Sequence, residues 1–387
     1  MPGIEVNNAS SPELVNPTSL SSQVTDTSNK GEQPPKRWTR RKIILWLGIA
    51  FLGLAALVLI ITLPVVLLRR HPPDHPSYHV KENHPLRVVD NFPDPGLLEF
   101  NGTWFAFGTN AKKSTTNKVH VPVATSDNFQ NWSILVGHDL LPEVGDWEIN
   151  PHHWAPDVIQ RDDGKFVLYY SGESKIHQPH HCVGVAVSEG TSPIGPYTPE
   201  KKPLACPMEY GGAIDPSPFR DADGKFYVSY KADGNSVGHG GDCNNAKKPL
   251  VSVPIMLQEL ENDGVTPVGD PVQILDIDES DGPLVEAPNI IRAEQGIYYL
   301  FFSSHCFTSP GYNVKYAHST SLKGPYKRAD RPLLRTGDFG LESPGGATVS
   351  HDGTRMVFHA NCDLIFRCMY AAAININLNS TITLASF

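Results

Sequence analysis

The sequence has little charge, and the charge that it has is not basic. Only 19% of the 387 residues are charged, with 32 Lys and Arg against 41 Asp and Glu, so the formal net charge is −9. A nucleic-acid-binding protein needs cationic side chains to displace counterions from phosphates, and this composition therefore argues against such a partner. The 34 prolines and 32 glycines are typical of a turn-rich β protein.

Motifs of several common enzyme classes are also missing. The chain contains no H-E-x-x-H, no P-loop and no C-x-x-C pair. Two other runs resemble metal-binding sequences, HQPHH (177–181) and DIDESDG (276–282). We interpret both runs as loops. In the second run, the glycine and the glutamate do not stand at the positions that a calcium loop requires.

Charge is absent altogether from residues 43–68, which are 26 consecutive uncharged and mainly apolar positions. As a helix they would be about 39 Å long, enough to cross the hydrocarbon core of a bilayer. The preceding residues 1–42 are polar and poor in aromatics, which predicts a disordered tail. A signal peptide is the alternative to a membrane span, but its apolar part is shorter and lies nearer the N-terminus.

The residues on either side of this span predict its orientation. Five Lys and Arg lie close before it and two directly after it, which places the N-terminus in the cytosol. All six cysteines follow the span, as do three N-glycosylation sequons at Asn101, Asn131 and Asn379. The sequence thus predicts a single-pass type II membrane protein that crosses the bilayer with residues 43–68. The part of the chain after the span is expected to be extracellular or lumenal.

The part beyond the predicted span carries the acidic excess. The tail 1–42 has six basic and four acidic residues, which leaves 26 basic and 37 acidic residues and a net charge of −11 for the rest. Residues 69–85 are rich in Pro and His and are interpreted as a stalk. Residues 86–387 remain as one folded domain, which we expect to be a monomer.

This outer domain contains an internal repeat. Five segments share a glycine turn followed by alternating aromatic and β-branched residues, a strong hairpin signal. The turn glycines are 62, 60, 72 and 57 residues apart, a period that suits a four-stranded sheet. We therefore predict an all-β fold, a five-bladed β-propeller, with a two-sheet sandwich as the structural alternative. The turn glycines are Gly102, Gly164, Gly224, Gly296 and Gly353.

A carboxylate beside or near a proline comes 7 to 11 residues before each turn glycine. Taken singly, an Asp beside Pro is a common turn former. Five acids near the start of the first strand of each blade should converge at one mouth of the central channel, and clustered acids indicate a functional site. Paired carboxylates cleave glycosidic bonds, one as acid and one as base or nucleophile. These acids are Asp94, Asp157, Asp215, Glu286 and Glu342.

The motifs NFPDP, WAPDV, AIDPSPF and EAPNI, each followed by its turn and aromatic strand, resemble glycoside hydrolase family 43 in order and spacing. The resemblance covers roughly residues 86–387 and implies a five-bladed propeller with an inverting mechanism. It implies that Asp94 is the general base, that Glu286 is the general acid, and that Asp215 raises the pKa of the acid and orients it. It also implies that Asp157 and Trp154 shape the substrate pocket, and Phe92 is a candidate stacking platform.

The sequence departs from this family in its last blade. Many members have a His after Pro-Gly near an axial metal, whereas residues 343–347 here read SPGGA. We expect no required cofactor or metal ligand, and an axial calcium stays an open alternative.

These motifs predict a glycosidase that cleaves arabinose- or xylose-containing plant-type polysaccharides or oligosaccharides, of the arabinanase, α-L-arabinofuranosidase or β-xylosidase kind. Two alternatives remain open. One is a catalytically silent propeller that binds glycans at the cell surface. The other is a fructan-active five-bladed enzyme, which would use a retaining nucleophile.

Overall fold

The computed structural model describes residues 84–110, 119–363 and 366–387, without the side chains of residues 150–152. The predicted tail and span, and the stalk apart from residues 84 and 85, lie outside the described residues. Within the described parts of the chain, no helix is long and apolar enough to cross a membrane.

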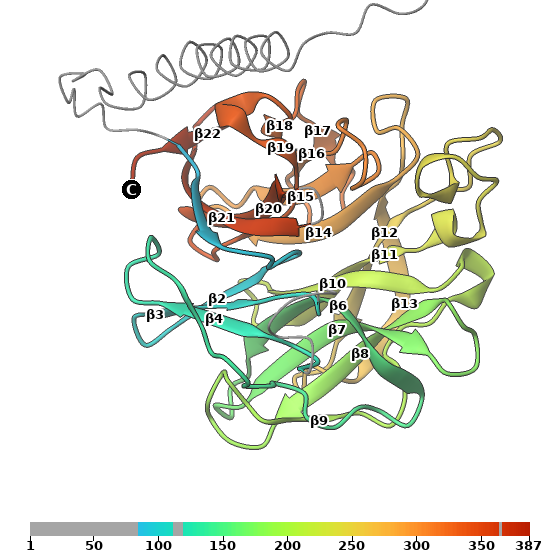
Figure 1. The fold of residues 1–387 in the computed structure, drawn as a ribbon, viewed down its shortest axis with the longest axis vertical. Coiled ribbons are helices and arrows are strands. Elements are labelled where there is room, and N and C mark those ends of the chain that lie inside the picture. The colour runs from blue at the N-terminus through green and yellow to red at the C-terminus, as the bar shows by residue number, and fades with distance from the viewer. Residues whose placement is uncertain (1–83, 111–118, 364–365) are drawn as a thin grey trace, which may run out of the picture. The chain divides into compact units, whose positions relative to one another are not determined.

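The described strands form five antiparallel sheets that follow one another around a centre in sequence order, from blue-green through yellow to red (Figure 1). This confirms the predicted all-β five-bladed propeller. The first blade contains β2 (Gly96–Phe100), β3 (Thr103–Phe107), β4 (Val123–Ser126) and β5 (Ser133–Ile134). The second contains β6 (Glu148–Gln160), β7 (Phe166–Ser174), β8 (His181–Ser188) and β9 (Tyr197–Pro199). The third contains β10 (Ala213–Arg220), β11 (Phe226–Ala232), β12 (Ile255–Leu260) and β13 (Pro267–Leu275).

The fourth blade adds a short strand, and the fifth joins the two ends of the domain. The fourth contains β14 (Val285–Arg292), β15 (Tyr298–Ser304), β16 (Asn313–Ser319), β17 (Lys327–Arg328) and β18 (Leu334–Arg335). The fifth contains β19 (Glu342–Val349), β20 (Arg355–Asp363), β21 (Phe366–Ile376), β1 (Leu86–Val89) and β22 (Ile382–Ala385). Since β1 and β22 pair with successive parts of the same edge of β21, the first and last strands close the ring together.

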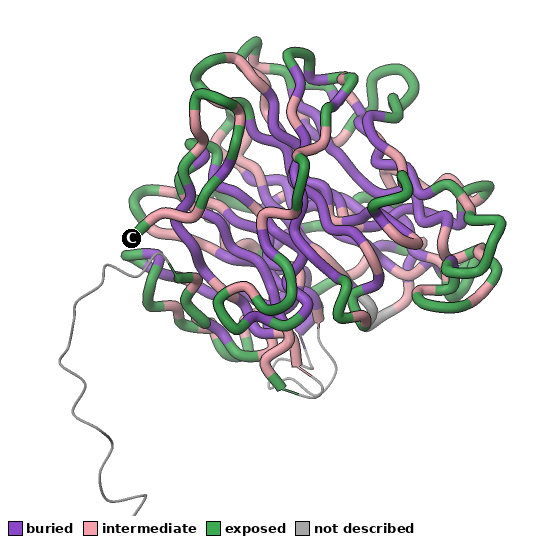
Figure 2. The backbone as a smooth tube through the Cα atoms, turned by 90° about the horizontal axis from the view of Figure 1, so that it is seen from above, coloured by how far each residue is buried: buried purple, intermediate pink, exposed green. Residues whose placement is uncertain are grey.

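The first strands β2, β6, β10, β14 and β19 contact one another in ring order, and the backbone at the centre is largely buried (Figure 2). We call the end at which these strands begin the mouth face. We call the opposite end the far face; there the five glycine turns join the first and second strand of each blade. The turn glycines have φ between +71° and +86°, a region that side chains with a Cβ rarely adopt.

Each pair of neighbouring blades buries at least one hydrophobic cluster, and the interface between the second and third blades buries two. The second strands supply much of these clusters, because β11 and β15 are buried at every position. A strand buried on both faces lies between two neighbouring sheets, which explains their continuous aromatic and branched sequences. Burial between blades therefore holds the first strands around the axis.

The mouth face carries the longer connections. Four short 3-10 helices lie in them: η1 (Met208–Tyr210), η2 (Gly234–Val237), η3 (Asp242–Asn244) and η4 (Asp338–Gly340). The six cysteines form three disulfides, and all three lie at this face. Six cysteines allow fifteen pairings, and the observed ones are Cys182–Cys206, Cys243–Cys306 and Cys362–Cys368.

The three sequon asparagines lie at the other end. Asn101 is in the turn between β2 and β3, Asn131 lies between β4 and β5, and Asn379 is in the turn between β21 and β22. All three are exposed and belong to the far face. β1 runs antiparallel to β21, and Leu86 at its start pairs with Ala371 in the middle of that strand.

Candidate active site

A kinked X-Pro dipeptide near the start of each first strand positions the site. The residue before the proline has φ between +43° and +57° in all five blades, which costs a residue with a Cβ about 1–2 kcal/mol. In four blades the dipeptide interrupts the pairing with the second strand, and in the first it directly precedes β2. The five dipeptides are Asp94-Pro95, Ala155-Pro156, Asp215-Pro216, Ala287-Pro288 and Ser343-Pro344.

Polar side chains satisfy the backbone N–H groups that these kinks expose. The N–H of Ala155 donates to the hydroxyl of Thr109, and the N–H of Asp215 donates to Ser171. In the next blade, the N–H of Ala287 donates to the carboxylate of Asp215 at 3.0 Å. Buried N–H groups require such partners, so each kink is fixed by a side chain from another strand.

The five predicted acids occupy different positions relative to the kinks. Asp94 and Asp215 are the kinked residues themselves, Glu286 precedes its kink by one residue, and Asp157 follows its proline directly. The prediction that the acids lie at equivalent positions was therefore wrong in detail. Glu342 corresponds to Glu286 in register but is exposed, so it does not belong to this buried group.

Asp94 is surrounded by groups that stabilise its ionised form. Arg367 lies 3.0 Å from Oδ1 of Asp94, and Thr109 donates a hydrogen bond to Oδ2 at 2.7 Å. Nδ1 of His359 lies 3.2 Å from Oδ1. Burial alone would raise the pKa of Asp94, but Arg367 and these hydrogen-bonding partners hold it well below its usual range. Asp94 is thus a carboxylate that can accept a proton.

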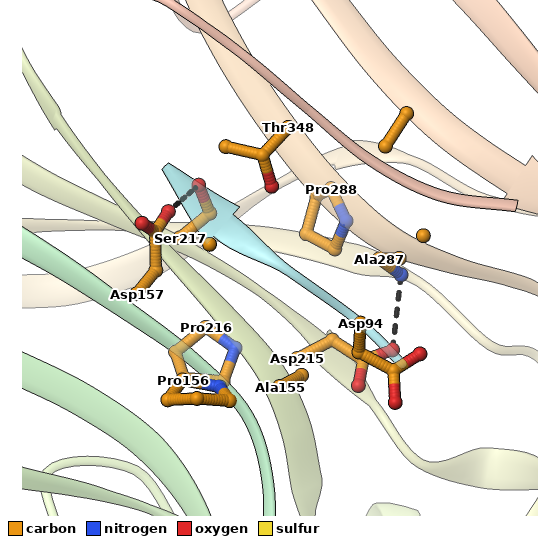
Figure 3. A pocket seen from close by; sticks show the side chains of 13 residues that line it. Asp94, Ala155, Pro156, Asp157, Asp215, Pro216, Ser217, Ala287, Pro288 and Thr348 are labelled. Carbon is orange, nitrogen blue, oxygen red and sulfur yellow. Dashed lines mark hydrogen bonds between the residues drawn. The ribbon is translucent and has the colours of Figure 1, made fainter. Parts of the chain in front are cut away.

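Asp215 and Glu286 have the opposite environment. Burial and the negative charge of Glu286 raise the pKa of Asp215 well above its usual range, whereas Lys231 opposes the rise. Two neighbouring buried carboxyls repel each other when both are ionised, which is why the charge of Glu286 raises the pKa of Asp215. In Figure 3, Asp215 and Asp94 lie near each other on the wall of a small axial cavity, and Asp215 accepts the hydrogen bond from Ala287.

Tyr312 connects these two halves of the site. Its hydroxyl donates to Oε1 of Glu286 at 2.8 Å, and its ring stacks on His359, the neighbour of Asp94. The two glycines after Pro344 make room for this arrangement. A Cβ on Gly345 would lie 1.9 Å from the ring of Tyr312, and one on Gly346 would lie 2.7 Å from the ring of His359.

The residues predicted to bind substrate fall in three different places. Asp157 lines the same cavity but turns towards Ser217, which donates a hydrogen bond to it at 2.9 Å (Figure 3). Trp154 is partly exposed and stacks on His181 with ring centroids 3.6 Å apart. Phe92 is only 1% exposed and packs between the first and fifth blades, so its prediction as a sugar-stacking platform is wrong. Phe307, which is 40% exposed and lies against Arg367, is the aromatic side chain that reaches solvent beside Asp94.

The axial cavity does not fit a calcium ion. Gly346 and Ala347 of its lining supply no side-chain donors there. Burial raises the pKa of Asp157 to about 7, so its carboxyl is not reliably ionised, and Ser217 already occupies one of its oxygens. Nowhere in the described chain do three or more His, Cys, Asp or Glu side chains form a group that could hold a metal.

The two runs interpreted as loops have structural partners. His180 of HQPHH contacts Ser236, and His181 lies under Trp154. In DIDESDG, the buried Asp281 pairs with Lys315 at 2.8 Å and with Arg328 at 2.7 Å. This acidic run therefore binds two cationic side chains of its own blade.

Four residues of the site had no signal in the sequence: Lys231, Tyr312, His359 and Arg367. They come from second and third strands or adjoining loops, where no repeat marks them. A G-x-S-x-G pentapeptide at residues 234–238 was also overlooked, although a catalytic serine elbow has that pattern. Its Ser236 lies in the 3-10 helix η2 and donates to the carbonyl of Gly211, so the strained strand-to-helix turn of such an elbow is not formed.

Comparison with known proteins agrees with this geometry. The sequence profile of the family Glycosyl hydrolases family 43 matches residues 87–367. The extracellular endo-alpha-(1->5)-L-arabinanase 2 of Bacillus subtilis (strain 168) is 27% identical over 305 residues, which are 73% of this chain and 56% of that protein. A second extracellular endo-alpha-(1->5)-L-arabinanase, from Thermotoga petrophila, is 25% identical over 60% of this chain and 50% of its own length. This chain thus spans about half the length of these two relatives.

A xylosidase/arabinosidase of Bacteroides ovatus is 23% identical over 70% of this chain and 86% of its own length. Among solved structures, a thermostable family-43 glycoside hydrolase superposes with a TM-score of 0.64 at 24% identity, covering 78% of this chain and 95% of that one. An endo-arabinase from Bacteroides thetaiotaomicron superposes with a TM-score of 0.58 at 21% identity, covering 76% and 96%. At these identities, the superpositions establish the shared fold.

Proposed function

Because this chain belongs to glycosyl hydrolases family 43, we propose that it is an inverting glycosidase that cleaves bonds in arabinose- or xylose-containing polysaccharides or oligosaccharides. One observation carries the proposal. Asp94, whose carboxylate is paired with Arg367, lies at the same mouth as two further buried carboxyls, Asp215 with its raised pKa and Glu286 with its bonds from Lys231 and Tyr312. The relatives described above are arabinanases and a xylosidase/arabinosidase, which supports the choice of sugar.

The proposed step uses both halves of the site. Asp94 takes a proton from a water molecule, whose oxygen forms a bond to the anomeric carbon of the sugar. The glycosidic bond to the departing oxygen breaks, and Glu286 donates its proton to that oxygen. Asp215 keeps the proton on the pair until this moment because two adjacent anions are unfavourable. Proton exchange with solvent then restores both groups.

Alanine variants of the two acting carboxyls test this function. We expect Asp94→Ala and Glu286→Ala each to lower the turnover of linear arabinan and of aryl arabinosides and xylosides by about 10³-fold or more. The matched control is Glu294→Ala, an exposed acid in the turn that follows β14, the strand of Glu286, which should retain activity. Near-normal turnover in either acid variant would contradict the assignment, and glycan binding without turnover in the wild-type chain would favour the silent propeller.

We further propose that residues 43–68 anchor the protein as a type II membrane protein. The uncharged run, its basic N-terminal flank and the positions of the cysteines and sequons support this topology. Protease treatment of sealed vesicles tests the proposal, because the domain should be digested if it faces the outside and protected if it lies in the lumen. Carbonate extraction tests the anchor, and a chain that carbonate washes off the membrane would contradict it.

A further inference from the structure

Glu286 is held from two sides by different kinds of group. Nζ of Lys231 donates to Oε2 at 3.0 Å, and the hydroxyl of Tyr312 donates to Oε1 at 2.8 Å. Both partners are 1% exposed, so solvent does not compete for these bonds. The same lysine also lies 3.2 Å from Oδ1 of Asp233, which is itself buried. One buried ammonium group thus joins two carboxyls, only one of which faces the proposed chemistry.

The two partners of Glu286 differ in what they can accept. An ammonium group has three donors and no acceptor, so Oε2 can only receive a hydrogen bond from Lys231. A phenolic hydroxyl both donates and accepts, and Ser303 lies within hydrogen-bond reach of Tyr312 as a second partner. Tyr312 can therefore donate to ionised Glu286 or accept from its protonated form, whereas Lys231 makes the same contact with both forms.

From these contacts we propose that Lys231 and Asp233 form a positioning pair for Glu286. Lys231 fixes Oε2, so that the transferable proton of this carboxyl sits on Oε1. Asp233 offsets part of the positive charge of Lys231, so that the lysine orients Glu286 without stripping the proton from the Glu286–Asp215 pair. This inference rests on the proposed glycosidase function and adds two residues to its machinery.

The charges around the pair agree in sign with this role. Burial alone would lower the pKa of Lys231, but Glu286 and Asp233 raise it well above its usual range, so the lysine remains a cation. Lys231 in turn lowers the pKa of Asp215. An uncompensated lysine at this position would therefore drive the carboxyl pair towards its fully ionised form.

Other charged or titratable groups face Glu286 from every neighbouring element, and their contribution must stay constant in a test. They are Asp215 on β10, Asp94 before β2, Tyr312 before β16 and His359 on β20, with Arg367 of β21 acting through Asp94. None of these side chains touches Asp233 in the described structure, so replacing Asp233 changes the charge beside Lys231 without removing any of these contacts. Asp233 itself also faces His180 of the second blade, whose charge interacts with it.

The test measures kcat/KM against pH with an aryl arabinoside and the full chain. Asp233→Asn removes a negative charge, so the alkaline limb should move to lower pH by about one unit. Lys231→Met removes the positive charge, so the limb should move to higher pH, with kcat lowered about tenfold or more because Oε2 is no longer held. A pair with a merely structural role would not move the alkaline limb of kcat/KM in opposite directions in the two variants.

Two control substitutions and one double variant separate an effect on Glu286 from a general loss of stability. Lys225→Met and Glu259→Gln break an exposed ion pair of 2.7 Å near the far end of the same blade, and should leave the pH profile unchanged. Lys231→Met with Asp233→Asn removes the pair without leaving an unpaired buried carboxylate, and should recover folding if Lys231→Met alone unfolds.

An unchanged alkaline limb of the pH profile in Asp233→Asn, or shifts of that limb in the same direction in both single variants, would overturn the inference. A wild-type chain without glycosidase activity would instead overturn the proposed function. The two failures are therefore distinguishable.

Discussion

The mouth face and the far face of this propeller are built from the same five sheets but by different rules. The far face consists of short glycine turns that recur in every blade, and it carries the three sequons. The mouth face consists of long, dissimilar loops and carries the three disulfides, the kinked acids and their cationic partners. The repeat thus holds the fold in place at one end, and the departures from it form the site at the other.

Disulfides at the mouth face offer the largest test of this division. In the chain-entropy account, removing Cys243–Cys306, which closes a loop of 63 residues, should lower the free energy of unfolding by about 4 kcal/mol. Removing Cys362–Cys368, which spans 6 residues, should cost about 2 kcal/mol. Urea unfolding of the paired serine variants measures both.

Activity should follow the reverse order, because Arg367 lies inside the short Cys362–Cys368 loop and Asp94 depends on it. If the short loop proved dispensable for turnover and the long one essential, the link between Arg367 and Asp94 would be wrong.

Arg367 provides the next comparison between the faces. Arg367→Met should lower kcat/KM about 10²-fold and move its acid limb to higher pH, because the pKa of Asp94 rises when the guanidinium is lost and the base must be ionised to act. Arg220→Met removes an exposed ion pair with Asp162 near the far face and should change neither quantity. A pH–rate profile of both variants measures the two quantities. Equal effects of the two substitutions would contradict the distinction between the faces.

Two glycines give a smaller contrast without any change of charge. Gly345→Ala places a methyl group against Tyr312 and should cost about 1–3 kcal/mol of unfolding free energy together with some turnover. Gly190, between β8 and β9 at the far face, has open space at its Cβ and an ordinary backbone conformation. Gly190→Ala should therefore be neutral within about 0.5 kcal/mol in thermal unfolding. A neutral Gly345→Ala would show that Tyr312 can move aside freely.

The sequons should have the smallest effect on chemistry. Asn101→Gln, Asn131→Gln and Asn379→Gln should each remove one glycan from protein made in a secretory host, seen as a loss of mass, while kcat/KM stays within about twofold. Glycans at none of the three asparagines would contradict the proposed topology, and a large loss of turnover would show that the far face contributes to the site.

The same contrast explains what the sequence could predict. The far-face turns repeat, so five blades could be counted from Gly102 to Gly353, and the prolines marked where the acids lie. Lys231, Tyr312 and Arg367 come from positions where the blades differ, and only packing brings them to the acids. The prediction for Phe92 failed because nearness in sequence to Asp94 does not say which way a side chain points, and this one points into the core. Glu342 failed because the fifth blade has the same kink as the others but exposes that acid.

The central claim is that Asp94 acts as a base on water and Glu286 as an acid on the departing oxygen, without a covalent intermediate, which is an inverting mechanism. Proton NMR of the first sugar released from an aryl α-L-arabinofuranoside tests it most directly, because the initial anomer is visible before mutarotation. The account predicts that the β anomer appears first with the wild-type chain, and that Asp94→Ala releases essentially none. Initial release of the α anomer would require a covalent nucleophile and would contradict the account.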